Sequence, residues 1–145
     1  MSEHLLVTNC KLFDETDNER LVSVLITDGV IRQIDSIKTG DVKDCTVFDA
    51  QKRTIVPGFI DVHIQGAGGA DILDATEDAL QAISKTCARF GVTGFLATTV
   101  HKPNQPNEHL TVAAEYAGKD LGGANLLGIH LEGPFIALQK KGMIQ

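Results

Sequence analysis

The sequence lacks the features that mark several classes of protein. It contains no tryptophan, and 13 basic residues stand against 19 acidic ones, which gives a formal net charge of −6. The basic residues are scattered, with only Lys140 and Lys141 adjacent, whereas a nucleic-acid-binding surface needs a clustered basic face. No run of about 18 apolar residues occurs, and residues 1–11 lack the basic start and apolar centre of a signal peptide. We therefore expect neither a nucleic-acid partner nor a membrane partner.

Cysteine is also scarce. Cys10, Cys45 and Cys87 are an odd number at wide, irregular spacing, and none has a second cysteine three residues away. This pattern favours a reduced cytoplasmic protein over a disulfide framework or a cysteine metal site. We expect the three cysteines to be small buried residues.

The first 56 residues have the character of β structure and predict the amino-terminal part of a small β domain. Asp28-Gly29 separates two apolar runs, 21–26 and 30–34, and such a pair is a strong hairpin signal because glycine supplies positive φ freely. Further short strands are predicted over 5–7, 11–13, 46–49 and 54–56. No catalytic pattern occurs in this part.

From residue 57 onward strands alternate with helices. Strands are predicted over 59–63, 95–100 and 126–131, and helices from the N-cap Thr76 to about Phe90 and over 108–116. Crossovers of this length imply a parallel sheet. The strand over 59–63 has almost no polar face, so we expect it to be covered on both sides. Gly66 to Asp71 is predicted to be a loop.

Two candidate metal ligands follow strands in this second part. His63 ends one strand before the glycine-rich loop, and Glu132 ends another before Gly133-Pro134. Strand-end ligands of this kind are typical of an α/β barrel enzyme, whose site lies at the carboxyl ends of the strands. The alternatives are a histidine that only forms a hydrogen bond and a glutamate in a surface salt bridge.

Other polar residues near these two are weaker candidates. Gln65 lies on the same side of an extended chain as His63, and its amide is a poor ligand that more readily orients water or substrate. His130 either faces the same way as Glu132 or packs in the wall of the sheet, and packing is favoured. The glycines of the loop fit either flexibility or close approach of a substrate, and they match no phosphate-binding fingerprint.

Four short motifs resemble one known family. They are P-G-F-I-D-V-H at 57–63 with the glycine-rich loop, F-G-V-T at 90–93, H-L-E-G-P-F at 130–135 and K-K-G at 140–142. Together they resemble the N-acetylglucosamine-6-phosphate deacetylases of the amidohydrolase superfamily. The first motif is shared by many amidohydrolases, whereas H-L-E-G-P-F followed by K-K-G is more specific to the deacetylases.

The resemblance implies an α/β fold, an incomplete (β/α)₈ barrel preceded by part of a small β-sandwich domain. Residues 1–56 would belong to the small domain, and residues 57–145 would form the first βα units of a truncated barrel. It implies hydrolysis of N-acetylglucosamine 6-phosphate to glucosamine 6-phosphate and acetate. The family's general-base aspartate is expected beyond Gln145, so the chain alone is predicted to be inactive.

The resemblance also implies the roles of individual residues. Glu132 would bind the main divalent metal, with zinc or iron expected, and His63 and Gln65 stand where relatives hold a second metal. Glutamine in place of histidine there favours a single metal. Gly66, Ala67 and Gly68 would line the substrate. Relatives have a substrate-contacting histidine where this sequence has Ile144.

Alternative functions remain open at this point. A different amidohydrolase, such as a cyclic amidase or a purine deaminase, would share the first motif. A non-catalytic fragment or binding module would bind metal weakly, because one glutamate and one histidine do not close a tetrahedral site. For the deacetylase we expect an amino-sugar phosphate as partner, a cytoplasmic location and a homo-oligomer.

Overall fold

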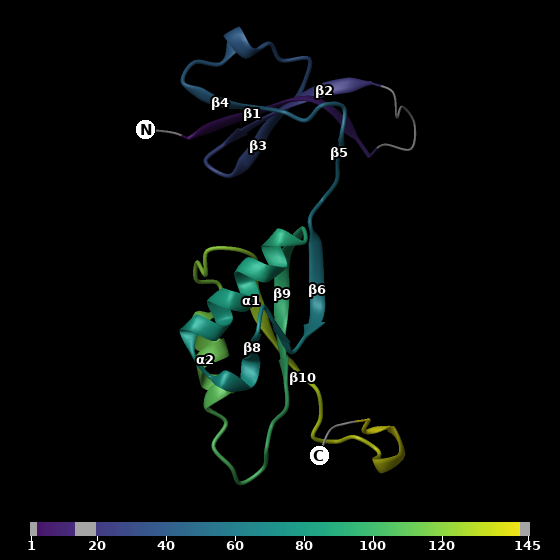
Figure 1. The fold of residues 1–145 in the computed structure, drawn as a ribbon, viewed down its shortest axis with the longest axis vertical. Coiled ribbons are helices and arrows are strands. Elements are labelled where there is room, and N and C mark those ends of the chain that lie inside the picture. Colours follow the sequence, from purple (N-terminus) through teal and green to yellow (C-terminus); the bar gives the residue numbers. More distant parts are fainter. Residues whose placement is uncertain (1–2, 14–19, 143–145) are drawn as a thin grey trace. The chain divides into compact units, whose positions relative to one another are not determined.

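The structure, a computed structural model, describes residues 3–13 and 20–142. The chain divides into two compact units, Met1–Pro57 and Gly58–Gln145, and each is described by itself. The division lies one residue from the boundary predicted between residues 56 and 57. Figure 1 shows strands in the first unit and strands with helices in the second.

The first unit is a five-stranded sheet with the order β3-β2-β1-β4, in which β5 also pairs with β1. β1 is antiparallel to β2 and parallel to both β4 and β5. The strands are β1 (His4–Leu12), β2 (Leu21–Thr27), β3 (Val30–Asp35), β4 (Cys45–Asp49) and β5 (Thr54–Ile55). One small cluster forms the core of this unit: Val7, Cys10, Val22, Val24 and Ala50.

The hairpin predicted from Asp28-Gly29 is confirmed. Both residues have positive φ, 50° and 74°, and they join the antiparallel strands β2 and β3. The two separate strands predicted over 5–7 and 11–13 are wrong, because β1 continues without ending through the polar residues Thr8 and Asn9 between them. Asn9 adopts a φ of 52°, and the pairing with β2 shifts register there, so a β-bulge accommodates the polar residue within one strand.

The second unit contains a three-stranded sheet with the order β10-β9-β6, in which all pairs are parallel. This confirms the parallel sheet predicted from the alternation of strands and helices. Its strands are β6 (Phe59–Ile64), β9 (Val92–Thr99) and β10 (Asn125–Leu131), and its helices are α1 (Glu77–Arg89) and α2 (Glu108–Tyr116). Among the described residues, 3-10 turns occur at Ile72–Asp74 and Leu138–Lys140 in this unit and at Thr39–Asp41 in the first unit. The two α-helices of the described residues, 13 and 9 residues long, are too short to cross a membrane.

Local signals explain where α1 begins. The Thr76 hydroxyl accepts a hydrogen bond from the Ala79 amide at 3.2 Å, as its predicted role of N-cap requires. Glu77 and Asp78 lie in the first turn, where carboxylates stabilise the positive helix end. The helix gives way to Gly91, whose φ of 81° suits a residue without a side chain.

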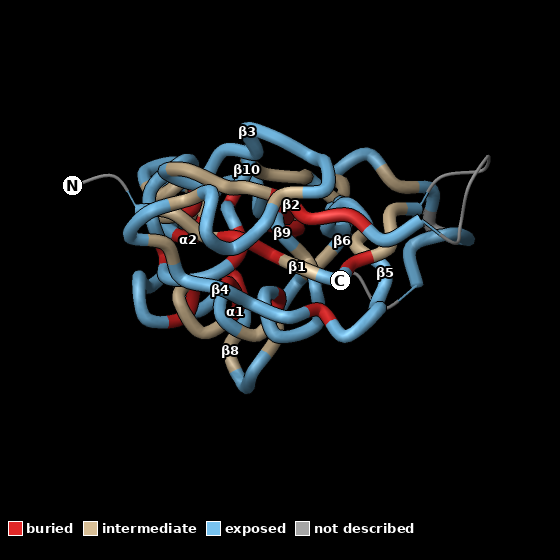
Figure 2. The backbone as a smooth tube through the Cα atoms, turned by 90° about the horizontal axis from the view of Figure 1, so that it is seen from above, coloured by how far each residue is buried: buried red, intermediate tan, exposed pale blue. Residues whose placement is uncertain are grey.

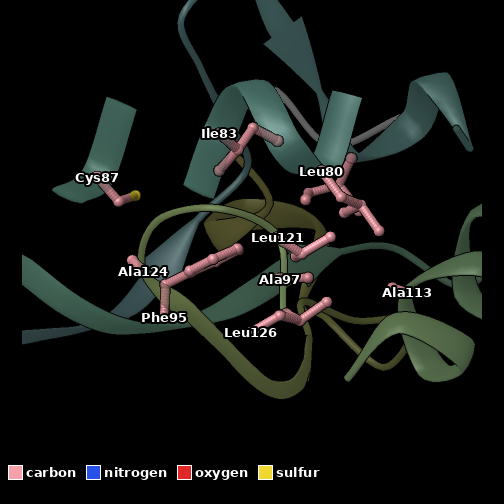
Figure 3. Packing of buried hydrophobic residues seen from close by; sticks show 10 residues of the cluster. Leu80, Ile83, Cys87, Phe95, Ala97, Ala113, Leu121, Ala124 and Leu126 are labelled. Carbon is pink, nitrogen blue, oxygen red and sulfur yellow. The ribbon is translucent and has the colours of Figure 1, made fainter. Parts of the chain in front are cut away.

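The core of this unit lies between α1 and the sheet. Figure 3 shows Leu80 and Ile83 of α1 above Phe95 and Leu126 of the strands. Ile83, Phe95 and Leu126 are each 0% exposed. In Figure 2 buried segments occur in both units, while β3 and β6 are largely exposed.

Two predictions for this unit need correction. Gly66 to Asp71 is not an irregular loop but a tight hairpin of β7 (Gly66–Ala67) and β8 (Ala70–Asp71), turned by two glycines of positive φ. β6 is not covered on both sides, since Phe59 is 66% exposed and Ile60 is 61% exposed. An apolar strand such as β6 is normally covered by other elements of the fold. In the described residues, however, β6 is an outer strand of the three-stranded sheet.

Candidate metal centre

The parallel pairing brings His63 and Glu132 to the same edge of the sheet. His63 lies near the end of β6, and Glu132 follows β10 directly, on either side of β9. The Glu132 amide donates to the Thr99 carbonyl at 2.8 Å and so extends the β9–β10 ladder by one step. Because carboxyl ends of parallel strands meet at one edge, residues 69 positions apart in sequence become neighbours.

Gln65 and His63 both approach one oxygen of Glu132. Gln65 Nε2 donates to Glu132 Oε2 at 2.7 Å, and His63 Nε2 lies 3.6 Å from the same atom. The side chains of His63 and Glu132 are 51% and 30% exposed, so the site is open to solvent. The structure therefore brings together the three residues that the sequence nominated as metal ligands. Their chemical role is a separate matter.

His130 lies beside this group and contacts the ring of His63. Its Nδ1 lies 3.0 Å from the Val62 carbonyl oxygen and 3.5 Å from Thr98 Oγ1. Its ring lies edge-to-face with that of His63, with centroids 5.0 Å apart and planes at 81°. The contact with the Val62 carbonyl has no signal in the sequence, because it depends on the register of β6 against β10.

The glycines of the β7–β8 hairpin have a structural reason of their own. A side chain at Gly66 would meet the Ala70 carbonyl, and one at Gly68 would meet the Thr86 hydroxyl. Gly68 also has a φ of 65°. Close packing against a backbone carbonyl and a side-chain hydroxyl accounts for the two glycines. A substrate role for Gly66, Ala67 and Gly68 stays a prediction. Ile144 lies outside the described residues.

The donor atoms present suit part of a divalent-metal site. Two ligands on one tetrahedral ion are separated by roughly 3.3 to 3.6 Å, given ligand distances of about 2.0–2.2 Å. The distance of 3.6 Å between His63 Nε2 and Glu132 Oε2 agrees with this separation. Within residues 3–13 and 20–142, however, no group of three or more His, Cys, Asp or Glu side chains gathers around one point. These two residues are thus a fitting but incomplete ligand set.

An apolar hollow of about 550 Å³ lies between α2 and β10. It is lined by Leu110, Thr111, Ala114, Ile129 and Leu131. None of the polar site residues lines it, so we assign it no part in the chemistry.

No protein-family model matches the chain. The N-acetylglucosamine-6-phosphate deacetylase of Bacillus subtilis is 33% identical over 146 residues, which cover 98% of this chain and 37% of that protein. The crystal structure of the Pasteurella multocida deacetylase matches 97% of this chain and 37% of its own, with a TM-score of 0.79 and 25% identity.

A third relative is a Mycobacterium smegmatis deacetylase variant, solved in complex with N-acetyl-D-glucosamine-6-phosphate. It matches 93% of this chain and 34% of its own, with a TM-score of 0.67 and 25% identity. The chain thus spans little more than a third of the length of these relatives. In sequence and in fold, the chain is similar to the amino-terminal part of the N-acetylglucosamine-6-phosphate deacetylases, as its motifs indicated.

Proposed function

We propose that this chain is the amino-terminal part of a metal-dependent hydrolase that removes the acetyl group from N-acetylglucosamine 6-phosphate. The products would be glucosamine 6-phosphate and acetate. The observation that carries the proposal is the meeting of His63, Gln65 and Glu132 at the carboxyl edge of a parallel sheet. Similarity to deacetylases over nearly the whole chain supports the choice of substrate.

The fold that accompanies this function is an incomplete (β/α)₈ barrel with part of a small β-sandwich domain. The β6–α1–β9–α2–β10 order of the second unit supports it, because each parallel strand is followed by a helix on the way to the next. In this proposal β6, β9 and β10 are the first three strands of the barrel. Their carboxyl ends then form one sector of the active site.

Glu132 is the residue to which we assign the main metal, with zinc or iron as the expected ion. When bound, the ion supplies Lewis-acid polarisation of the acetamide carbonyl. Gln65 holds the Glu132 carboxylate in place through its amide donor, and His63 offers a second ligand atom beside the same oxygen. Gln65 is itself a neutral amide, so a single metal fits this group better than a pair.

The substrate contacts are proposals of the same kind. Gly66 and Ala67 form β7 directly after the His63–Gln65 segment, and Gly68 begins the turn that follows. This proximity in the chain supports a role for their backbone in contacting a sugar phosphate bound beside Glu132. A cytoplasmic location and a homo-oligomeric state stay predictions from the sequence.

The function is tested by assaying acetate release from N-acetylglucosamine 6-phosphate by the product of the complete reading frame that encodes this chain. Removal of the metal with a chelator should abolish turnover. Glu132→Gln should lower kcat/KM by at least about 100-fold, because a metal ligand contributes several kcal/mol to transition-state stabilisation. Glu115→Gln is the matched control, since Glu115 is an exposed residue of α2 and forms an ion pair with Lys119, which follows the helix.

Two outcomes would contradict the proposal. One is activity that survives both chelation and Glu132→Gln, and the other is turnover of a cyclic amide in preference to the sugar phosphate. The 145-residue chain by itself should release no acetate, because its described residues bring only His63 and Glu132 together as ligands. Acetate release by the chain alone would show that the described ligand set is sufficient.

A further inference from the structure

His130 makes a hydrogen bond whose chemistry fixes its tautomer. The Val62 carbonyl oxygen only accepts, so the contact of 3.0 Å requires a proton on His130 Nδ1. The Thr98 hydroxyl lies farther away, at 3.5 Å from the same nitrogen, and therefore makes the weaker contact. In the neutral ring, Nδ1 is the donor and Nε2 carries the lone pair.

This hydrogen bond reaches the backbone immediately before His63. Val62 and His130 are 68 residues apart and lie on β6 and β10, which are separated in the sheet by β9. His130 therefore links the two outer strands of the sheet across the middle one. The carbonyl group that accepts the hydrogen bond from His130 belongs to the peptide bond between Val62 and His63.

The same ring also limits the motion of the His63 side chain. The two imidazoles lie edge-to-face with centroids 5.0 Å apart, which is a favourable aromatic arrangement. His63 is 51% exposed, so few other atoms hold its ring in one orientation. Its Nε2 nevertheless faces Glu132 Oε2.

We propose that His130 is a positioning residue, which holds the Val62–His63 peptide through its Nδ1 donor and so directs the His63 imidazole toward Glu132. In this proposal the hydrogen bond from Nδ1 to the Val62 carbonyl contributes more to the orientation of His63 than the contact between the two rings does. The inference depends on the proposed function only for the ion that His63 and Glu132 would share. The orientation of His63 itself can be measured without any metal.

Two variants of the 145-residue chain separate the donor from the ring. His130→Asn keeps an N–H group near the position of Nδ1 but loses the ring, whereas His130→Phe keeps a ring and loses the donor. His101→Asn is the matched control, because His101 is an exposed histidine in the loop after β9. Circular dichroism melting first shows that each variant is folded.

The first measurement is the order of the His63 ring, from ¹³C side-chain relaxation at about pH 8, where an ordinary histidine is neutral. We expect a lower order parameter in His130→Phe and a nearly unchanged one in His130→Asn and His101→Asn. An unchanged His63 order parameter in His130→Phe would overturn the inference. An equal loss in His130→Asn would also overturn it, because the donor would then not be what matters.

The second measurement is the binding of Zn²⁺ alone, followed by calorimetry. Groups that orient a ligand typically change metal affinity by about 10- to 100-fold, and the exposure of His63 places this case at the lower end. We expect about 10-fold weaker binding in His130→Phe, with recovery in His130→Asn. If the unmodified chain binds no zinc, its incomplete ligand set accounts for that result, and the relaxation measurement alone decides the role of His130.

Discussion

Phe95→Ala is expected to destabilise the second unit strongly. Phe95 is 0% exposed and lies in the cluster between α1 and the parallel sheet (Figure 3). Truncating a fully buried phenylalanine costs about 3 to 5 kcal/mol, because the transfer free energy is lost and a cavity remains. A unit of this size is stable by roughly 4 to 13 kcal/mol, so the variant should lose a large share of its stability.

The assay is urea unfolding followed by far-ultraviolet circular dichroism, since the chain has no tryptophan to serve as a fluorescent probe. With a denaturant slope of about 2 kcal/mol per molar urea, the midpoint should fall by roughly 1.5 to 2.5 M. Phe135→Ala is the control, because Phe135 is 99% exposed in the same unit and should change the midpoint little.

If the urea midpoint of Phe95→Ala decreased by less than about 0.5 M, the reasoning would be refuted, because a loss of about 1 kcal/mol is too small for a packed core position. An equal fall in Phe135→Ala would refute it as well. In that case the exposed phenylalanine would be packed against something in solution.

Two further predictions concern charge and the edges of the sheet. Tyr116 is the only tyrosine, and its hydroxyl donates to Glu77 at 2.6 Å, which raises the pKa of Tyr116 above its ordinary value. The resulting stabilisation is present below the unfolded pKa of about 10 and is lost as pH rises through the folded pKa. In a pH titration followed by phenolate absorbance, Tyr116 should therefore ionise at a lower pH in Glu77→Ala than in the unmodified chain. An unchanged titration midpoint would show that the bond to Glu77 is not the cause of the raised pKa. Light scattering should show oligomers of the unmodified chain, because β6 is an outer strand of the described sheet with exposed apolar residues. Ile60→Lys should reduce the association more than Leu73→Lys, which lies off the strands, and a monodisperse monomer of the unmodified chain would count against the prediction.

The elements that were predicted correctly have local signals. Asp28-Gly29 determines a turn by backbone conformation alone, and Thr76 begins α1 by a bond to an amide three residues away. The range predicted for α2 from 108 to 116 agrees with the structure, because its apolar spacing and flanking residues are also local. Such features need no knowledge of distant partners.

Two of the errors depend on partners elsewhere in the chain. The bulge at Asn9 keeps β1 continuous because β2, β4 and β5 pair along it, and a polar dipeptide alone gives no sign of them. The exposure of β6 depends on whether a neighbour covers it, which its own apolar composition does not reveal.

The candidate site divides in the same way. His63, Gln65 and Glu132 were identifiable because each stands at or just after the end of a predicted strand. Their separations were not predictable, because strand register sets the 2.7 Å bond from Gln65 to Glu132. The contact of His130 with a backbone carbonyl was likewise out of reach, since every residue has such a group.

The bond between Gln65 and Glu132 has a consequence for how any cation arrives. The amide holds the carboxylate in one rotamer beforehand, which removes part of the ordering entropy that a flexible glutamate would lose on binding. A cation bound at Oε2 withdraws electron density from the oxygen that accepts this hydrogen bond, so binding should change the environment of the Gln65 amide. The NMR signal of the Gln65 side-chain NH₂ group should therefore shift when a cation binds Glu132 Oε2.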